Sequence, residues 1–150
     1  MHFIARTLLF LAPVVVASHA AEPAPHALTS TIFEWDKLLV EKKPTGERRE
    51  ICEGTTPTLA QFRSHVTTLT PHSPWPATEV HTDEEIVIIK EGALEYEIDG
   101  RIRQAGPGAM ILITAGTIHR SHNAGDTPAT YYVFHVVTRE AASAAAQPKP

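Results

Sequence analysis

Short runs of β-branched and aromatic residues recur about every ten residues through the middle of this sequence, with turn-forming residues between them. No long stretch has the 3.6-residue apolar period of an amphipathic helix. The expected strands are Thr31–Trp35, Arg48–Cys52, Leu59–Leu69, Ile86–Lys90, Leu94–Ile98, Ile102–Gln104, Met110–Thr114, Ile118–His122 and Tyr131–Thr138. Short, evenly spaced strands predict an all-β fold, either a sandwich or a barrel.

Turn signals indicate that neighbouring strands run antiparallel. Apolar and acidic residues alternate through Leu94–Ile98, and Asp99-Gly100 follows directly. Asp-Gly between alternating segments is a strong hairpin signal, so Arg101 is expected to begin a returning strand. Gly106-Pro107-Gly108 and Gly125-Asp126-Thr127-Pro128 predict two further turns.

The first 20 residues have the pattern of a secretory signal peptide. Arg6 is their single charged residue, an uncharged run covers residues 7–17, and Ser18-His19-Ala20 precedes Ala21. Small residues before the Ala20/Ala21 bond fit signal-peptidase cleavage. A retained membrane anchor is the alternative, but eleven residues interrupted by Pro13 fall short of the roughly 20 that a spanning helix needs. The sequence therefore predicts a secreted or periplasmic protein without membrane attachment after cleavage.

The rest of the chain divides into one domain and two short ends. Residues 21–29 are rich in Pro and Ala and are expected to be a flexible lead-in. Residues 140–150 are expected to be either a frayed helix or a disordered tail. The packed domain then covers residues 30–139, and a chain of this length can bury a core without a disulfide. The single cysteine, Cys52, is assigned no function.

The charge balance argues against a nucleic-acid partner. Without the predicted leader the chain has 12 Lys and Arg against 17 Asp and Glu, a formal charge of −5. Binding to phosphate backbones needs a basic stripe instead. Lys42, Lys43, Arg48 and Arg49 form the one basic cluster, and interspersed glutamates indicate a solvated loop.

Two segments concentrate potential metal ligands. Glu79 and His81 have the same parity on a strand, so their side chains share a face. Glu85 also has this parity, but an unbroken strand would place it about 13 Å beyond His81, which is too far for one ion. A turn or bulge at residues 82–84 would let Glu79, His81 and Glu85 meet His119 from the second segment. That arrangement predicts a site of two imidazoles and two carboxylates.

These residues resemble the two motifs of the cupin family, G-x5-H-x-H-x3/4-E-x6-G and G-x5-P-x-G-x2-H-x3-N. The first motif is matched in spacing by Glu79, His81, Glu85 and Gly92, and the second by Gly108, Gly116, His119 and Asn123. Ser73 stands in place of the first Gly, Thr114 in place of the Pro, and Glu79 in place of the first His. The resemblance covers about residues 58–138.

The resemblance implies an antiparallel jelly-roll barrel, or double-stranded β-helix, with a metal site inside its mouth. Glu79, His81, Glu85 and His119 are the implied ligands. With Glu79 in place of a His, a divalent site would be neutral, which favours manganese or iron and still allows zinc. The alternative is a domain that has lost its metal, with Glu79 pointing to solvent. Two carboxylates gathered without a cation would repel each other, which argues for the metal.

The functional expectation is an enzyme of dioxygenase, decarboxylase or isomerase type, acting on a small oxygen-bearing substrate. Glu79 is then a ligand or the general base. Tyr96, Tyr131 and His135 are expected to line the substrate pocket. The alternative is a non-catalytic module that binds a small metabolite. Resemblance further suggests a homodimer.

Other histidines have weaker claims on the site. His122 has the opposite strand parity to His119 and is expected at the surface. His65 lies on an expected strand, where a pocket-lining role and a core role are both open. His72 is a reserve ligand should Glu79 not coordinate.

Overall fold

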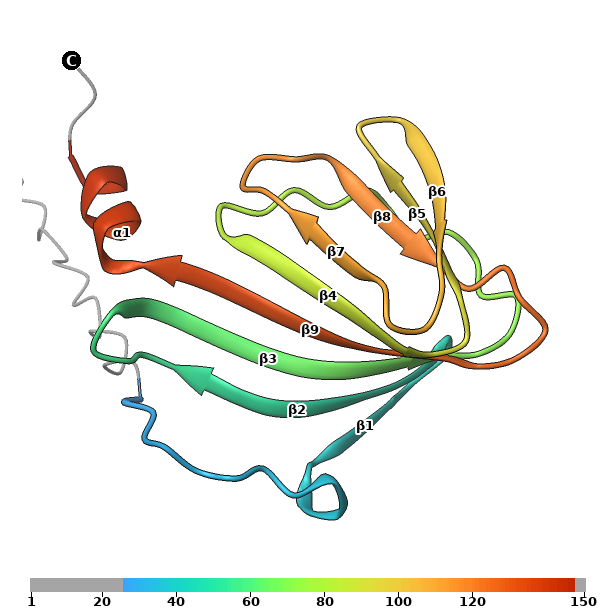
Figure 1. Ribbon diagram of the computed structural model, residues 1–150, viewed down its shortest axis with the longest axis horizontal. Coiled ribbons are helices and arrows are strands. Elements are labelled where there is room, and N and C mark those ends of the chain that lie inside the picture. The colour runs from blue at the N-terminus through green and yellow to red at the C-terminus, as the bar shows by residue number, and fades with distance from the viewer. Residues whose placement is uncertain (1–25, 148–150) are drawn as a thin grey trace, which may run out of the picture.

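The computed structural model describes residues 26–147, whose strands form two antiparallel sheets (Figure 1). The larger sheet has the order β1 (Val40–Lys43), β2 (Gly46–Gly54), β3 (Leu59–Leu69), β9 (Ala129–Thr138), β4 (Glu84–Glu91) and β7 (Met110–Ile113). The smaller sheet has the order β6 (Arg101–Ala105), β5 (Leu94–Ile98) and β8 (His119–His122). This is the all-β antiparallel jelly roll that the strand spacing and the motifs predicted.

Most of the predicted strands are present, but the prediction of a first strand at Thr31–Trp35 is wrong. Residues 31–34 form no strand, and Trp35 begins a short 3-10 helix, η1 (Trp35–Lys37). The ring of Trp35 lies 4.6 Å from the guanidinium of Arg49 and 4.7 Å from the ammonium of Lys90. The edge position beside β2 is taken by β1, a strand that the sequence did not predict. Val40–Lys43 has no buried residue, so no apolar alternation marks it.

The Asp99-Gly100 hairpin forms as predicted. β5 and β6 pair from Ile98↔Arg101 to Leu94↔Ala105. Asp99 and Gly100 have φ angles of 48° and 75°, the two positive values that a tight type I′ turn requires. The turn therefore fixes the register of the small sheet.

The inner face of the larger sheet changes from apolar to polar along each strand. On β4 the inward positions are Val87 and Ile89, which pack against the small sheet, and Glu85, which does not belong to that core. β9 repeats the pattern, with Tyr131 and Val133 in the core and His135 beyond them. The core cluster comprises Val87, Ile89, Leu94, Tyr96, Ala129, Tyr131 and Val133. One end of the space between the sheets is thus filled by apolar side chains, and the other end by polar ones.

Asn123 fastens the loop after β8 to the loop after β3. Its side chain is fully buried, and its amide donates to the carbonyl oxygens of Thr70 at 3.1 Å and Thr127 at 2.8 Å. The hydroxyl of Ser73 accepts a 2.9 Å hydrogen bond from the Asn123 backbone N–H. Ser73 therefore has a structural contact of its own at the position where the family motif has Gly.

The two ends of the chain are described in part. The predicted signal peptide, residues 21–25 of the lead-in and residues 148–150 lie outside the described residues. Helix α1 (Arg139–Ala145) follows β9, and the Thr138 side chain caps its first turn at 3.1 Å from the Ala141 N–H. Within residues 26–147, no helix combines the length and the apolar character needed to cross a membrane.

Candidate metal centre and pocket

The two motif segments meet at a backbone bridge between Glu79 and His119. The Glu79 N–H donates to the His119 carbonyl at 2.8 Å, and the His119 N–H donates to the Glu79 carbonyl at 3.0 Å. His81 lies two residues beyond Glu79 on the same face, as its strand parity predicts. The Gly116 N–H donates to the His81 carbonyl at 2.8 Å, which holds the loop before β8 against this segment.

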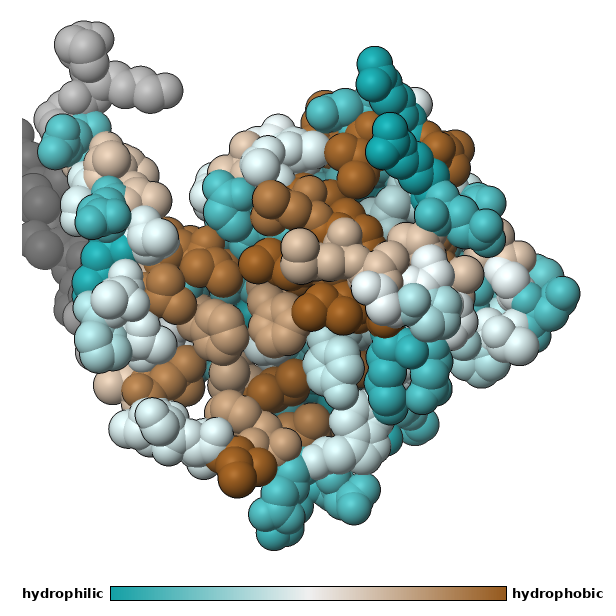
Figure 2. Space-filling model, viewed as in Figure 1, coloured by the Kyte–Doolittle hydropathy of each residue, from teal (hydrophilic) through white to brown (hydrophobic). Residues whose placement is uncertain are grey.

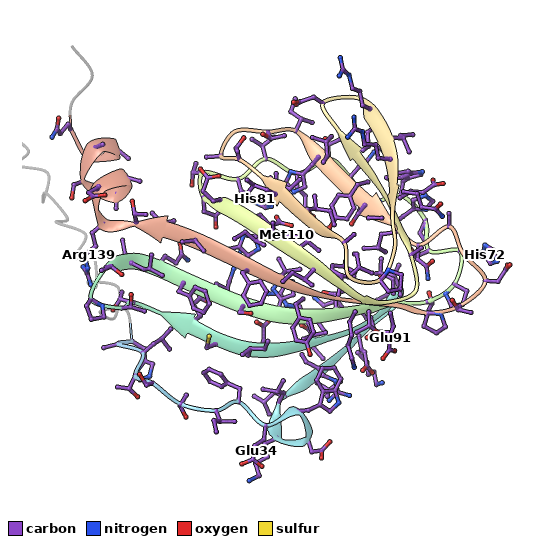
Figure 3. All side chains as sticks on the ribbon, viewed as in Figure 1. Glu34, His72, His81, Glu91, Met110 and Arg139 are labelled. Carbon is purple, nitrogen blue, oxygen red and sulfur yellow. The ribbon has the colours of Figure 1, made fainter. Side chains whose placement is uncertain are left out.

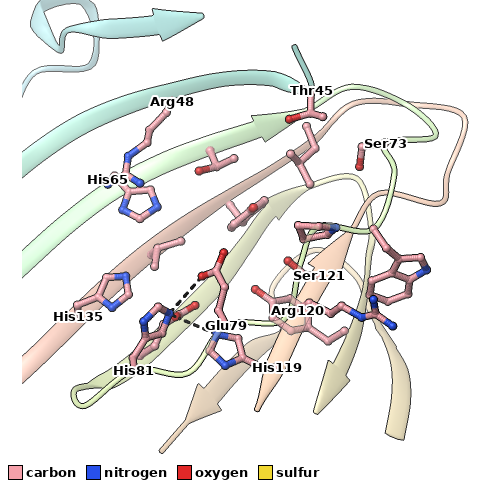
Figure 4. A pocket seen from close by; sticks show the side chains of 18 of the residues that line it. Thr45, Arg48, His65, Ser73, Glu79, His81, His119, Arg120, Ser121 and His135 are labelled. Atoms are coloured by element: carbon pink, nitrogen blue, oxygen red, sulfur yellow. Dashed lines mark ion pairs between the residues drawn. The ribbon is translucent and has the colours of Figure 1, made fainter. Parts of the chain in front are cut away.

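A bend at Thr82 and Asp83 brings Glu85 back toward His81, as the distance argument required. One carboxylate oxygen of Glu85 lies 3.3 Å from Nε2 of His81 and 3.4 Å from Nε2 of His119. Glu85 is 7 % exposed, so this carboxylate is held at the base of the cluster. Glu79 approaches from the open side, with its oxygen 3.2 Å from the same His81 nitrogen (Figure 4).

Three of these four side chains, Glu79, His81 and His119, are arranged to hold a cation, and Glu85 contacts both imidazoles. Ligand atoms of Glu79, His81 and His119 all lie within 4.8 Å of one another. Donor atoms about 2.1 Å from a shared metal would be roughly 3.0–3.4 Å apart, and the nitrogen-to-oxygen distances here are 3.2, 3.3 and 3.4 Å. Nε2 of His81 is buried and makes no hydrogen bond, although two carboxylates are adjacent. A metal ion between these groups would satisfy that nitrogen.

The surroundings of the cluster orient His119 and keep Glu85 ionised. Nδ1 of His119 lies 3.1 Å from the Thr117 carbonyl, so a proton on Nδ1 leaves the Nε2 lone pair facing the cluster. Burial by itself would raise the pKa of Glu85, but the hydrogen bond with His119 and the nearby imidazoles lower this pKa by more than burial raises it. The pKa of Glu85 is thus below its usual value, and the side chain is a carboxylate. In the absence of a cation, the contact with Glu85 raises the pKa of His119.

The cluster opens into a cavity of about 470 Å³ between the two sheets, within the usual range for small-molecule sites. Tyr96, Tyr131 and His135, the three predicted pocket residues, all lie on its wall. Burial raises the pKa of Tyr131 to about 12 and that of Tyr96 well above 10. Both hydroxyls are therefore protonated near neutral pH and can donate hydrogen bonds to a ligand.

Asp83 is a site-adjacent residue that the sequence did not identify. Its carboxylate lies 3.2 Å from Nδ1 of His135, and the His135 ring lies edge-on to His81 with ring centres 5.3 Å apart. Burial lowers the pKa of His135, so the ring is neutral near pH 7 despite this carboxylate. Asp83 lies in the bend at residues 82–83 that is needed to bring Glu85 back to His81. Its place in that bend was the sequence feature that could have indicated a position beside the site.

The opposite wall of the cavity carries basic residues, and the prediction of a solvated loop for the basic cluster is wrong. Lys42 and Lys43 are exposed on β1, but Arg48 points from β2 into the cavity (Figure 4). It is joined there by Arg63 and His65 of β3. Strand parity was the missed signal, because residues 63, 65 and 67 share one face of a predicted strand and are all polar.

The remaining histidines lie outside the cluster. His72 sits in the loop after β3, far from His81 (Figure 3), and pairs with Asp126 at 2.9 Å. His122 faces away from the cavity as its parity predicted, yet its side chain is only 12 % exposed. It lies against the Trp75 ring, with centres 3.8 Å apart, and 3.1 Å from Glu95. Neither residue is placed to bind the same ion as His81.

Comparisons with known proteins agree on the fold. Residues 65–135 match the family model Cupin_2, described as a cupin domain. The structure of KdgF from Halomonas sp. has a TM-score of 0.58 and 18% identity, covering 70% of this chain and 94% of that chain. An RmlC-like cupin from Shewanella frigidimarina has a TM-score of 0.58 and 15% identity, covering 74% and 95%.

A third solved structure has a named activity. The polyketide cyclase RemF from Streptomyces resistomycificus has a TM-score of 0.59 and 15% identity, covering 72% of this chain and 80% of that chain. Identities this low carry the fold and no activity. No sequence among the curated proteins matches this chain.

Proposed function

This chain contains a small domain of the cupin superfamily, and on that premise we propose that it binds one divalent transition metal and acts on a small oxygen-bearing substrate. Glu79, His81, Glu85 and His119 would hold the metal. The observation that carries the proposal is the buried Nε2 of His81, which has no hydrogen-bond partner although two carboxylates lie 3.2 and 3.3 Å away.

Two imidazoles and two carboxylates define the metal that fits. The two carboxylate charges balance a divalent ion, and oxygen-rich sites suit manganese and iron, with zinc also able to bind. A bound ion would supply Lewis acidity toward a carbonyl, enolate or diol oxygen of the substrate. The chain itself contributes orientation, because the cavity wall presents hydroxyl donors from Tyr96 and Tyr131.

Glu79 and Glu85 would then have different roles. The Glu85 side chain is 9 % exposed and contacts both imidazoles, whereas the Glu79 side chain is 58 % exposed. A substrate entering from solvent meets Glu79 first. We therefore assign Glu79 as the exchangeable ligand and the general base, holding a proton from the substrate on its carboxylate. The activity falls in the dioxygenase, decarboxylase or isomerase class.

A non-catalytic binding module is the second candidate, and the tyrosines favour it. Because the pKa values of Tyr96 and Tyr131 are raised, these hydroxyls are poor proton acceptors near neutral pH. Glu79 is then the most exposed carboxylate among the cavity-lining residues, and His135 is the other candidate base on the wall. If the Glu79→Gln variant keeps the metal and binds ligands unchanged, and the wild type turns over no phenol, keto acid or sugar, the module replaces the enzyme.

Metal analysis tests the metal-binding part. Protein refolded separately with manganese, iron(II) and zinc should retain about one equivalent of one of these ions per chain. His81→Ala and His119→Ala should lose it. His72→Ala is the matched control, because His72 is exposed and pairs only with Asp126. Absence of bound metal from the refolded wild type would contradict the proposal.

We also propose export and a homodimer. Export rests on the leader pattern and predicts a mature N-terminus at Ala21, measurable by mass spectrometry of secreted protein. The homodimer is supported by apolar side chains over β4 and β7 (Figure 2), where Met110 and Leu112 are 68 % and 57 % exposed on an edge strand. Leu112→Glu should give a monomer in analytical ultracentrifugation. Ile102→Glu, equally exposed on β6, should leave the assembly unchanged.

A further inference from the structure

The cavity has two chemically different ends. The metal cluster occupies one end, and the inner faces of β2 and β3 form the other, with Arg48, Arg63 and His65 on the wall. Figure 4 shows Arg48 and His65 above the cluster, and these residues and His81 line the same cavity. A ligand in this space would contact both ends.

Strand register places Arg63 in line with the metal cluster. Glu85 of β4 is paired with His135 of β9, and His135 is paired with Arg63 of β3. Strands are about 4.8 Å apart, so the Cα atoms of Glu85 and Arg63 are separated by roughly 10 Å. His135 lies between them on the same face, so a small molecule in the cavity above His135 could contact both the Arg63 side chain and the metal cluster.

Arg63 and His65 have polar atoms without partners. Nε of Arg63 and Nδ1 of His65 are buried and make no hydrogen bond. His65 is 6 % exposed. Among the described residues, Arg63 forms no ion pair, whereas Arg48 pairs with Glu50 and Arg120 pairs with Glu97. Buried polar atoms in native proteins are normally satisfied, so the Arg63 Nε–H indicates a missing acceptor, and Nδ1 of His65 indicates a missing hydrogen-bond partner.

The charges around the cavity indicate the sign and the magnitude of the charge on the missing group. A divalent ion would balance Glu79 and Glu85, and burial keeps the pKa of His65 at about 3, so this imidazole is neutral. The carboxylate of Asp83 contacts His135, and among the described residues none forms an ion pair with the Arg63 guanidinium. A partly buried charge without a direct counter-ion is costly, and one negative charge beside it would compensate it. A carboxylate carries one charge, whereas a phosphate monoester carries nearly two near pH 7.

We infer that the substrate or ligand of this site is a small monocarboxylate, whose carboxylate group binds Arg63, with Arg48 and His65 beside it, and whose other end reaches the metal cluster. The planar guanidinium of Arg63 offers paired N–H donors that match a carboxylate. This inference deepens the proposed function and rests on it for the metal end, but the carboxylate contact can be tested separately.

The test uses benzoate and acetate as probes, with benzamide and acetamide as uncharged analogues of the same shape. Isothermal titration of the full-length mature chain should detect the carboxylates and not the amides, in both metal-free and metal-loaded protein. Arg63→Gln should weaken benzoate binding by about ten- to a hundredfold, as expected for the loss of a charged hydrogen bond. The benzoate affinity of Arg63→Lys should lie between those of the wild type and Arg63→Gln. Arg48→Gln should weaken benzoate binding less than Arg63→Gln does, because Arg48 already pairs with Glu50.

Arg103→Gln is the matched control, because Arg103 is exposed on β6 and its loss changes the net charge equally. Its benzoate affinity should equal that of the wild type. Equal binding of benzoate and benzamide, unchanged benzoate binding in Arg63→Gln, or tighter binding of inorganic phosphate than of benzoate would each overturn the inference. If carboxylates bind through Arg63 in a protein that retains no metal, the proposed function fails and the carboxylate site stands.

Discussion

Glu79 and His119 exchange two backbone hydrogen bonds, at 2.8 and 3.0 Å, across the junction of the two motif segments. The bridge depends on main-chain groups alone, so it does not require a particular side chain at position 79, provided that the residue is not proline. Replacement of a His by Glu79 therefore alters the chemistry of the cluster without altering the path of the chain.

Glu79→His is expected to change metal preference and keep the fold. The variant would offer three imidazoles and one carboxylate, so a divalent site would carry a net positive charge. Competition binding should show that the preference for zinc over manganese rises by about tenfold, because imidazole favours zinc more than manganese. Glu84→His, at an exposed neighbouring position, is the control. A preference that does not change in Glu79→His would mean that residue 79 is not a ligand.

Two reasons for requiring glycine, close packing and a positive φ angle, can be separated by comparing substitutions at Gly92 and Gly108. Both have positive φ angles, 71° and 80°. A Cβ at Gly92 would lie 2.5 Å from the Pro128 carbonyl oxygen, whereas a Cβ at Gly108 would meet nothing within 4 Å. Gly108→Ala should cost about 1–2 kcal/mol from the left-handed conformation alone. Gly92→Ala should cost at least about 2 kcal/mol more, measured by urea unfolding. Equal losses would show that the loop before Ala129 yields without cost.

The sequence predicted the fold because its strand signals are local. Leu59–Leu69 and Leu94–Ile98 have the bounds that alternation and turns gave them, and Asp99-Gly100 forms the expected hairpin. Val40–Lys43 was missed because an edge strand with no buried face has no alternation to detect. Thr31–Trp35 was predicted as a strand from composition alone, and nothing local shows that the edge beside β2 is already occupied.

The candidate site was predictable where a motif constrains spacing, and less so elsewhere. Glu79, His81, Glu85 and His119 come together because a bend and a bridge unite two segments that the sequence marks. Arg48 and Arg63 were not foreseen, because their place on the wall depends on the pairing of β2 with β3 and of β3 with β9. Strand parity indicates that Arg63 and His65 share a polar face, but register between distant strands has no local signature, so the place of that face on the cavity wall required the three-dimensional structure.

Asn123 is expected to stabilise the fold without taking part in metal binding. Asn123→Ala would remove a fully buried side chain that donates to the carbonyls of Thr70 and Thr127 and accepts from the Gly125 N–H. The free energy of unfolding should fall by about 2–4 kcal/mol, since each of these lost hydrogen bonds contributes roughly 0.5–1.5 kcal/mol. Gln104→Ala, exposed on β6, should change it by less than about 0.5 kcal/mol. Metal content per folded chain should be equal in the two variants, and loss of metal from folded Asn123→Ala would contradict this assignment.

His65 is expected to make the folded state less stable in mild acid. Burial lowers its pKa from 6.5 to about 3, so between these values the unfolded chain binds a proton that the folded chain does not. Stability is therefore lost as the pH falls below about 6.5, and one such group contributes about 2 kcal/mol between pH 7 and pH 5.

His65→Gln removes this contribution and keeps a polar side chain. Urea unfolding of metal-free protein should show that the variant loses about 2 kcal/mol less than the wild type between pH 7 and pH 5. Metal-free protein is needed because proton competition at His81 and His119 would add its own pH dependence. Parallel stability curves for the two proteins would show that His65 is protonated in the folded state, which is incompatible with a buried neutral ring against Arg48 and Arg63.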